Sequence, residues 1–399
     1  MPTAAKTQNY AKQKMISQKI LKKFEKIEHG FLEIKLPNQK VLRFGNPESH
    51  PRADIEIKDL HLIDLVVLKG DIGLGQGYIE NLFETSDLAN LLYFFTLNQK
   101  QIESFFYGKK LFTVFYAIKH FLRGNNIKGS RKNISHHYDL GNSFYSLWLD
   151  PSMTYSSGIF AGSESLEESQ KQKYLRIISQ LTNGGKDILE IGCGWGGFME
   201  EAAKNGFNVL GLTLSQEQLH FAQSRMQRQN LTSKAILKDY RHEDGKFDNI
   251  VSIEMFEAVG KKYWNDYFAK VKECLKANGK ALVQTITIDE EAYKNYEKTS
   301  DFIREFIFPG GFLPTKSDFE KIAQNNGLKV CDRFEFGDSY DKTLALWLEN
   351  FEAAKPQILQ LGFDESFIRK WRFYLAYCMA GFRGRRIDVV QYSLVHEGN

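Results

Sequence analysis

The sequence predicts a doubly wound α/β domain that follows a smaller α+β domain. Apolar segments of strand length alternate with amphipathic helical segments from residue 187 onward, which is typical of a parallel sheet with helices on both faces. The first of these strands runs into a glycine-rich loop. The chain is long enough for two domains, because 399 residues with 42% hydrophobic content can bury two cores.

The glycine-rich loop lies in residues 187–197, where an apolar strand meets four closely spaced glycines. These are Gly192, Gly194, Gly196 and Gly197. Glycine permits positive φ, and without a Cβ it lets the backbone lie against a ligand. Open α/β sheets bind ligands at the carboxyl ends of their strands. We therefore predict that this loop holds a nucleoside cofactor.

The spacing of the glycines favours S-adenosylmethionine over a dinucleotide. A dinucleotide loop has the pattern G-x-G-x-x-G, with an acidic residue about 20 positions later for a ribose hydroxyl. Here the glycines alternate, Glu190 precedes them on the strand, and the next strand ends at Thr213 without a carboxylate. A carboxylate near the loop suits a cationic sulfonium.

The remaining elements complete the alternation of strands and helices. Further strands are predicted over residues 208–213, 235–239, 247–253 and 280–286, and helices over 198–204, 215–228 and 264–275. Ser215 is the predicted cap of its helix. Because several strand ends then meet in one cleft, we expect Thr213, Gln218, Asp239 and Tyr240 around the ribose and adenine of the cofactor.

Several motifs resemble those of the bacterial cyclopropane-fatty-acyl-phospholipid synthases, also called the mycolic acid cyclopropane synthase-like family. They occur in that family's order between residues 133 and 395. The motifs are YDLGN (138–142), MTYSS (153–157), EIGCGWGG (190–197), DYR (239–241), MFE (255–257), FPGG (308–311), YDKTL (340–344) and GFRG (381–384).

The resemblance implies a Rossmann-like class I methyltransferase. Such an enzyme transfers the methyl carbon of S-adenosylmethionine to a cis double bond of a phospholipid acyl chain and closes a cyclopropane ring. Carried over by motif, the implied cofactor contacts are Tyr155, Ser156, Glu190, Gly192, Gly194, Gly196, Thr213, Leu214, Gln218, Asp239 and Tyr240.

The resemblance also implies a bound bicarbonate that acts as the base. The family holds it in a cage formed by a Cys, a Glu, a His, a backbone amide and a Tyr. The corresponding positions in this chain are Ser157, Glu257, Gln284, Ile286 and Tyr340.

Two cage side chains depart from that pattern, since Ser157 replaces the Cys and Gln284 replaces the His. Ala258 also stands where the family often has a His. A hydroxyl and an amide can still hydrogen-bond an anion, but the titratable imidazole is lost. As simpler alternatives, Gln284 could only close a strand end and Ser157 could only cap a helix.

Three other functions therefore stay open. The first is a lipid C-methyltransferase that leaves a methyl or methylene branch. The second is a small-molecule N- or O-methyltransferase on the same scaffold. The third is a lipid-binding protein whose methyltransferase half is inactive.

Residues 1–125 are predicted to form the smaller domain, and residues 126–399 the methyltransferase domain. The resemblance implies that the smaller domain gathers lipid or mediates dimerisation, so a homodimer is one expected assembly. A hairpin is predicted over residues 30–44, a strand over 53–57, a helix over 61–68, a glycine-rich loop over 70–77 and a linker over 124–130. No nucleotide is expected at residues 70–77, because that segment follows a helix and not a strand.

The composition does not suggest a nucleic-acid partner, because the net charge is only +4, from 53 basic and 49 acidic residues. The basic excess is local. Seven lysines lie in residues 6–26, where apolar side chains recur at helical spacing. This pattern predicts a basic amphipathic helix that lies on anionic lipid. A solvated helix packed on its own domain is the alternative.

The cysteine pattern and hydropathy predict a cytoplasmic protein. The four cysteines show no paired or metal-ligand spacing, so neither disulfides nor a metal site is expected. The sequence has no transmembrane segment, since no uncharged apolar run approaches the length of about 18 residues that spans a membrane. We therefore expect peripheral association with the inner face of the membrane, where the chain would meet unsaturated phospholipid.

Overall fold

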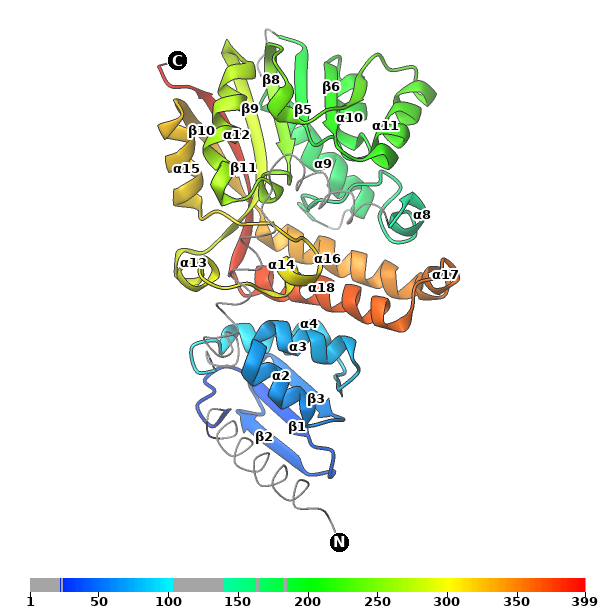
Figure 1. Ribbon diagram of the computed structural model, residues 1–399, viewed down its shortest axis with the longest axis vertical. Helices are drawn as coiled ribbons and strands as arrows, with labels where there is room; N and C mark the ends of the chain where they lie inside the picture. The colour runs from blue at the N-terminus through cyan, green and yellow to red at the C-terminus, as the bar shows by residue number, and fades with distance from the viewer. Residues whose placement is uncertain (1–21, 23, 103–139, 163–164, 182–184, 399) are drawn as a thin grey trace. The chain divides into compact units, whose positions relative to one another are not determined.

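The computed structural model forms two compact units (Figure 1). The residues that it describes are 22, 24–102, 140–162, 165–181 and 185–398. The first unit contains the described residues up to 102 together with Tyr296–Glu305 and Phe363–Gly384, and the second contains the others. The predicted domain boundary at residue 125, the predicted linker and nearly all of the predicted basic helix lie outside the described residues.

The second unit is built on a mostly parallel seven-stranded sheet in the order β10-β11-β9-β8-β5-β6-β7. Its strands are β5 (Asp187–Ile191), β6 (Asn208–Thr213), β7 (Lys234–Leu237), β8 (Phe247–Ile253), β9 (Leu275–Ile288), β10 (Leu328–Glu335) and β11 (Ile387–His396). Only β11 runs antiparallel to its neighbours among these strands. The predicted doubly wound fold is confirmed, with β5 at the point where the strand order reverses.

Helices cover both faces of this sheet (Figure 1). The helices that lie wholly in the second unit are α8 (Asn142–Tyr145), α9 (Leu166–Ser179), α10 (Gly197–Lys204), α11 (Gln216–Arg228), α12 (Trp264–Cys274), α15 (Lys316–Asn325), α16 (Gly337–Ala353) and α17 (Lys355–Gln360), with 3₁₀ turns η1 (Tyr240–His242), η2 (Phe256–Ala258) and η3 (Lys261–Tyr263). Adjacent residues of a strand point to opposite faces. On β11, Gln391 bonds Arg176 of α9 and Tyr392 stacks on Phe319 of α15 at 4.1 Å, so these helices lie on opposite faces.

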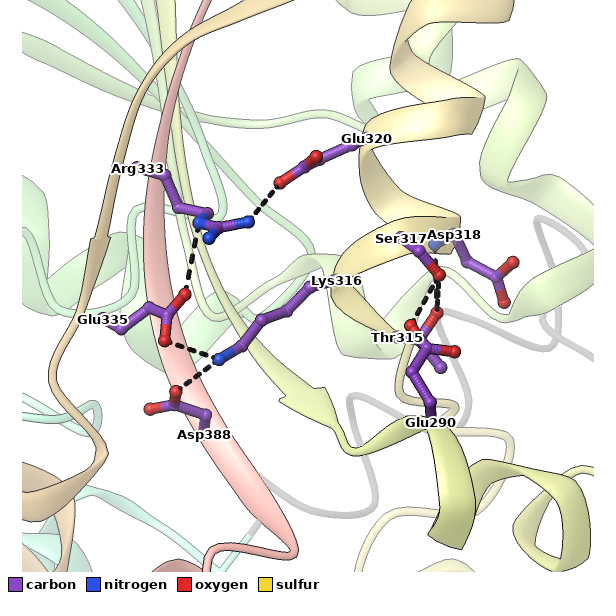
Figure 2. Close-up of polar contacts among 9 residues, drawn as sticks. All are labelled: Glu290, Thr315, Lys316, Ser317, Asp318, Glu320, Arg333, Glu335 and Asp388. Carbon is purple, nitrogen blue, oxygen red and sulfur yellow. Dashed lines mark hydrogen bonds and ion pairs between the residues drawn. The ribbon is translucent and has the colours of Figure 1, made fainter.

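A charged network links α15 to strands β10 and β11 (Figure 2). Lys316 donates to Glu335 of β10 and Asp388 of β11, both at 2.7 Å. Arg333 bridges Glu320 of α15 and Glu335 at 2.9 and 3.1 Å. These side chains are substantially exposed, so we attribute the position of α15 mainly to its buried aromatic contacts.

The first unit has a four-stranded sheet in the order β2-β1-β3-β4, with helices packed against it. The elements are β1 (Phe31–Lys35), β2 (Val41–Gly45), β3 (Arg52–Ile57), β4 (Phe83–Glu84), α2 (His61–Lys69), α3 (Asp71–Ile79), α4 (Leu88–Leu97) and α18 (Glu365–Arg383). The predicted hairpin is confirmed as the antiparallel pair β1–β2. Two short helices, α13 (Glu290–Tyr296) and α14 (Phe302–Phe306), lie where the chain passes between the residues of the two units.

Helix α18 joins the first unit from the far end of the sequence. The Arg369 guanidinium donates to the carbonyls of Tyr78 and Phe83 and to Glu84, and it lies 3.9 Å from the centroid of the Tyr78 ring. An Arg that satisfies three acceptors below the surface orients the whole helix. The sequence did not reveal that residues 363–384 pack with the N-terminal strands.

The prediction of a glycine-rich loop at residues 70–77 is wrong, because Asp71–Ile79 form α3. A Cβ at Gly73 would meet the Leu65 carbonyl, one at Gly75 the Phe302 ring, and one at Gly77 the Leu62 side chain. The glycines therefore serve close packing of α3 against its neighbours. This packing offsets the helix penalty of about 1 kcal/mol per glycine.

Asp71, in the first turn of α3, is withdrawn from water. Its carboxylate accepts from Tyr377 Oη of α18 at 2.6 Å and from the Ile72 amide at 2.7 Å. Burial, with a contribution from Asp301, raises the pKa of Asp71 from 3.8 to about 7.

We expect Asp71→Asn to stabilise the first unit at pH 8. The folded pKa of Asp71 exceeds the ordinary value, so its contribution to stability is fully present below pH 3.8 and is lost as the pH rises through about 7. The neutral amide should remove this loss, a gain on the order of 1 kcal/mol in the free energy of unfolding. Urea unfolding at pH 5 and pH 8 measures it. Asp64→Asn on α2 is the control, and equal pH dependence in wild type and Asp71→Asn would contradict the assignment.

Candidate functional site

The loop after β5 is shaped by three glycines in the left-handed region. Gly192, Gly194 and Gly196 have φ of +85°, +52° and +80°. The amides of Gly192 and Cys193 donate to the Leu212 carbonyl of β6 at 3.0 and 2.9 Å, which anchors the loop. A Cβ at Gly196 would lie 3.1 Å from that of Ala222, whereas a Cβ at Gly194 would meet nothing within 4 Å. Gly194 therefore faces open space at the carboxyl end of the strand.

The end of β6 supplies two of the predicted cofactor residues side by side. Thr213 Oγ1 donates to Gln218 Oε1 at 2.8 Å and accepts from the Ser215 amide at 3.1 Å. Ser215 caps α11 as predicted, because its side chain accepts from the Gln218 amide. Leu214 lies in the bend between them. The structure thus brings Thr213, Leu214 and Gln218 together beside the glycine loop.

Asp239 and Tyr240 follow the end of β7, the strand beside β6. Asp239 accepts from the Arg241 amide at 3.0 Å and from its guanidinium at 2.6 Å. Burial opposes ionisation, but the hydrogen bonds from Arg241 hold the pKa of Asp239 below its ordinary value. The Tyr240 ring packs against Tyr267 with centroids 5.6 Å apart. The contact of both residues with adenine stays a prediction.

Glu190, at the end of β5, is buried beside a lysine that the sequence did not single out. Burial raises the pKa of Glu190 to about 8, and its Oε2 has no hydrogen-bond partner among the described residues. Lys173 of α9 is fully buried and donates to Ser156 Oγ at 2.5 Å and Gln170 Oε1 at 2.6 Å. Burial lowers the pKa of Lys173 to about 7, against the attraction of nearby carboxylates. A buried lysine that titrates near neutral pH thus lies beside Glu190.

The segment before α9 is held by packing and by this lysine. The Tyr155 ring lies 5.6, 5.6 and 5.3 Å from the rings of Tyr145, Trp148 and Trp347. The Ser156 hydroxyl accepts from Lys173. Tyr155 and Ser156 are therefore fixed in position by side chains from three helices.

Three of the five predicted cage residues converge on one carboxylate, that of Glu254. The Ser157 amide donates to Glu254 Oε1 at 2.9 Å, and Gln284 Nε2 donates to the same oxygen at 2.7 Å. Tyr340 Oη donates to Glu254 Oε2 at 2.6 Å. Ser157 contributes only its amide, because its hydroxyl donates to the Gly158 carbonyl at 2.9 Å.

The other two predicted cage residues bond each other. Glu257 Oε1 accepts from the Ile286 amide at 2.5 Å and from Thr285 Oγ1 at 3.0 Å. Its Oε2 is buried without a hydrogen-bond partner among the described residues. Burial and the nearby Glu254 raise the pKa of Glu257 to about 8. Two carboxyl groups thus lie close together, and burial favours the protonated form of Glu257.

Sequence reasoning missed Glu254 and the residues that orient Gln284. The available signal for Glu254 was its position as a carboxylate directly after β8. Gln391 Nε2 of β11 donates to Gln284 Oε1 at 2.9 Å, and Arg176 donates to Gln391 Oε1 at 2.7 Å. This chain of donors turns the Gln284 amide nitrogen toward Glu254.

Comparisons with known proteins agree with the resemblance. The chain matches the family described as mycolic acid cyclopropane synthetase over residues 125–392. It is 34% identical over 352 residues to cyclopropane-fatty-acyl-phospholipid synthase of Escherichia coli K12, covering 85% of this chain and 87% of that protein. It is 36% identical over 281 residues to tuberculostearic acid methyltransferase of Mycobacterium tuberculosis, covering 67% of this chain and 66% of that protein.

The chain is also similar to a solved structure of a mycolic acid cyclopropane synthase. Mycolic acid cyclopropane synthase in complex with SAH and CTAB superposes with a TM-score of 0.62 at 32% identity. The superposition covers 66% of this chain and 97% of that one.

Valine at Gly194 should abolish binding of S-adenosylmethionine and of its demethylated product. Gly194 combines positive φ with a Cβ direction into the open space after β5. Gly206→Val is the matched control, because Gly206 also has positive φ (+84°) and open space but precedes the amino end of β6. Titration calorimetry should show binding in wild type and Gly206→Val only. Unchanged affinity in Gly194→Val would move the cofactor elsewhere.

Proposed function

The chain belongs to the mycolic acid cyclopropane synthetase family, and we propose that it transfers the methyl carbon of S-adenosylmethionine to a cis double bond of a phospholipid acyl chain, closing a cyclopropane ring. The observation that carries this proposal is the convergence of Ser157, Gln284 and Tyr340 on one carboxylate, with Glu257 and Ile286 beside it. These groups come from separate parts of the chain. Their meeting is what an active site for this chemistry requires.

The reaction has two physical demands that the site can meet. An alkene is a weak nucleophile, so it must be held against the methyl group in a water-poor pocket. The aromatic cluster of Tyr155, Trp148 and Trp347 supplies apolar walls next to the cofactor segment. The polar groups gathered around Glu254 then stabilise the positive charge that develops on the acyl chain.

Bicarbonate, which the family resemblance implies, does not fit the cage that these residues form. The Ser157 amide, the Gln284 amide and the Tyr340 hydroxyl all donate to Glu254. The Ile286 amide donates to Glu257. A second anion would find these donors engaged and a carboxylate facing it, so bicarbonate has no part in the proposed reaction.

A lipid C-methyltransferase is the second candidate. It is favoured by the 36% identity to a relative that is named a methyltransferase and by the absence of the imidazole from the cage. The two candidates share the cofactor, the acyl substrate and the first step. They differ in where the cation loses its proton.

Association with a membrane surface is part of the same proposal, because the substrate lies in a bilayer. No helix in the described part of the chain is long and apolar enough to cross one. The predicted basic segment at residues 6–26 would supply the contact, and a homodimer would present two such segments. Assays should therefore offer the substrate as unsaturated phospholipid in anionic vesicles.

The fate of a trideuterated methyl group distinguishes the two candidates. Ring closure expels one deuteron from the transferred methyl, because the new ring carbon is a methylene, so the product should keep two. Mass spectrometry of the product lipids measures the label. NMR of the product made from the unlabelled donor should show no vinyl protons, which a methylene branch would have. Retention of all three deuterons in the main product would identify a C-methyltransferase. Absence of any modified lipid would leave only the small-molecule or binding functions.

Tyr340→Phe and Glu257→Ala should each lower kcat by about a hundredfold or more, because each removes a polar group from the site of charge development. The Tyr340 hydroxyl donates to Glu254, and Glu257 accepts from the end of β9, so we expect cofactor affinity by calorimetry to stay near that of the wild type. Tyr392→Phe is the control for Tyr340→Phe. It removes the hydroxyl of another buried tyrosine, one without a hydrogen-bond partner among the described residues. Wild-type rates in Tyr340→Phe and Glu257→Ala would show that the site is misplaced.

A further inference from the structure

We propose that the carboxylate of Glu254 is a built-in base, which fills the anion cage permanently and removes the proton from the transferred methyl group without bicarbonate. This inference rests on the proposed function. It assigns a catalytic role to a residue that neither the motifs nor the comparisons single out.

The first support is that both carboxylate oxygens of Glu254 are positioned by donors from distant elements. Oε1 accepts from the Ser157 amide, in the loop before α9, and from Gln284 of β9. Oε2 accepts from Tyr340 of α16 at 2.6 Å. Three donors in fixed directions are the arrangement that holds a small carboxylate-shaped anion. Here the chain supplies that anion itself.

The second support is that the donors are themselves held in place. Ser157 and Gln284 are 0% and 1% exposed. The Gly158 amide donates to Thr343 Oγ1 of α16 at 3.0 Å, which ties the loop to the helix that carries Tyr340. Gln284 is oriented by Gln391. A preorganised cage of this kind costs no rearrangement during the reaction.

The third support is the backbone of Glu254, which has a φ of +50°. A residue with a Cβ pays on the order of 1 kcal/mol for this left-handed conformation, whereas glycine adopts it freely. The Glu254 amide nevertheless donates to the Gln284 carbonyl at 2.8 Å, so the conformation is locked. Strain that the surroundings maintain is often found at functional positions. Here it aims a carboxylate into the cage.

The fourth support is electrostatic. Withdrawal from water raises the pKa of Glu254, which is opposed by the Tyr340 hydrogen bond and by the charge of buried Lys173. A carboxylate that is held by three donors and is more basic than in water suits proton abstraction. Glu257 lies close by, with its own pKa raised to about 8, and bicarbonate would add a further anion beside these two carboxyl groups.

The step balances without an added reagent. The π pair of the alkene forms a bond to the donor methyl while the S–CH₃ bond breaks and leaves the neutral thioether. One former alkene carbon then carries the positive charge. Glu254 takes a proton from the transferred methyl, and the freed C–H pair closes the ring onto the cationic carbon. Glu254 becomes a carboxylic acid and returns the proton to water before the next turnover.

The wild-type enzyme should therefore be indifferent to bicarbonate. We expect equal kcat in carbonate-free buffer and after addition of bicarbonate, and no broadening of the NMR signal of ¹³C-bicarbonate by the full chain. A wild-type rate that rises severalfold with bicarbonate, or ¹³C-bicarbonate bound by the wild type, would overturn the proposal.

Glu254→Gly tests the cage directly, because glycine relieves the strain and frees the three donors. A general base contributes typically 10²–10⁴-fold, so we expect a loss of about a hundredfold or more in carbonate-free buffer. Bicarbonate or formate should restore much of the rate, and ¹³C-bicarbonate should now bind. Asn230→Gly is the matched control. Asn230 has φ of +53° at an exposed position after α11, and its variant should behave as the wild type throughout.

The other possible results also test whether Glu254 is the base. A Glu254→Gly enzyme that keeps the wild-type rate without any anion refutes the role of Glu254. If this variant does not fold, Glu254→Gln keeps the side-chain volume but cannot take the proton, and it should lose about a hundredfold or more in rate at unchanged cofactor affinity. If the wild type modifies no lipid, the proposed function fails, and the ¹³C-bicarbonate comparison of wild type and variant still tests whether Glu254 fills the cage.

Discussion

One buried carboxyl group, that of Glu254, organises the second unit around the site. A carboxylate removed from water is costly unless hydrogen bonds and a counter-charge replace its hydration. Glu254 obtains these from Ser157, Gln284 and Tyr340, with Lys173 nearby. Because its donors belong to a loop, a central strand and a late helix, the unit must be folded before the charge is compensated. Stability and the catalytic arrangement therefore depend on the same contacts.

The sheet explains how such distant groups meet. Parallel strands β5, β6 and β8 end at one edge, which places the glycine loop, Thr213 and Glu254 next to one another. The antiparallel strand β11 then adds Gln391, whose Cα pairs with that of Gln284 in the ladder. Strand register thus sets the direction of the Gln284 amide. Arg176 extends this control to α9 on the same face.

Much of this fold could be predicted from the sequence, because it depends on interactions between residues that are close in the chain. The strand–glycine–helix–strand pattern, the Ser215 cap and the hairpin β1–β2 depend on short-range rules, and all three are confirmed. Glu254 was missed because its role depends on a positive φ and on partners 97 and 86 residues away. Residues 70–77 were read as a loop because glycine composition does not show that a neighbouring helix needs the space.

The place of α18 has a consequence for how the chain is made. Residues 363–384 pack with α3 and α4, and Arg369 satisfies carbonyls at Tyr78 and Phe83. During synthesis the N-terminal sheet and helices leave the ribosome long before this partner does. Until α18 has been synthesised, the faces of α3 and α4 that pack against it stay exposed. The first unit therefore completes its core only when the chain is almost finished. Each unit is built from three separate segments of the chain. Dividing the gene at a single point therefore cannot yield either unit whole.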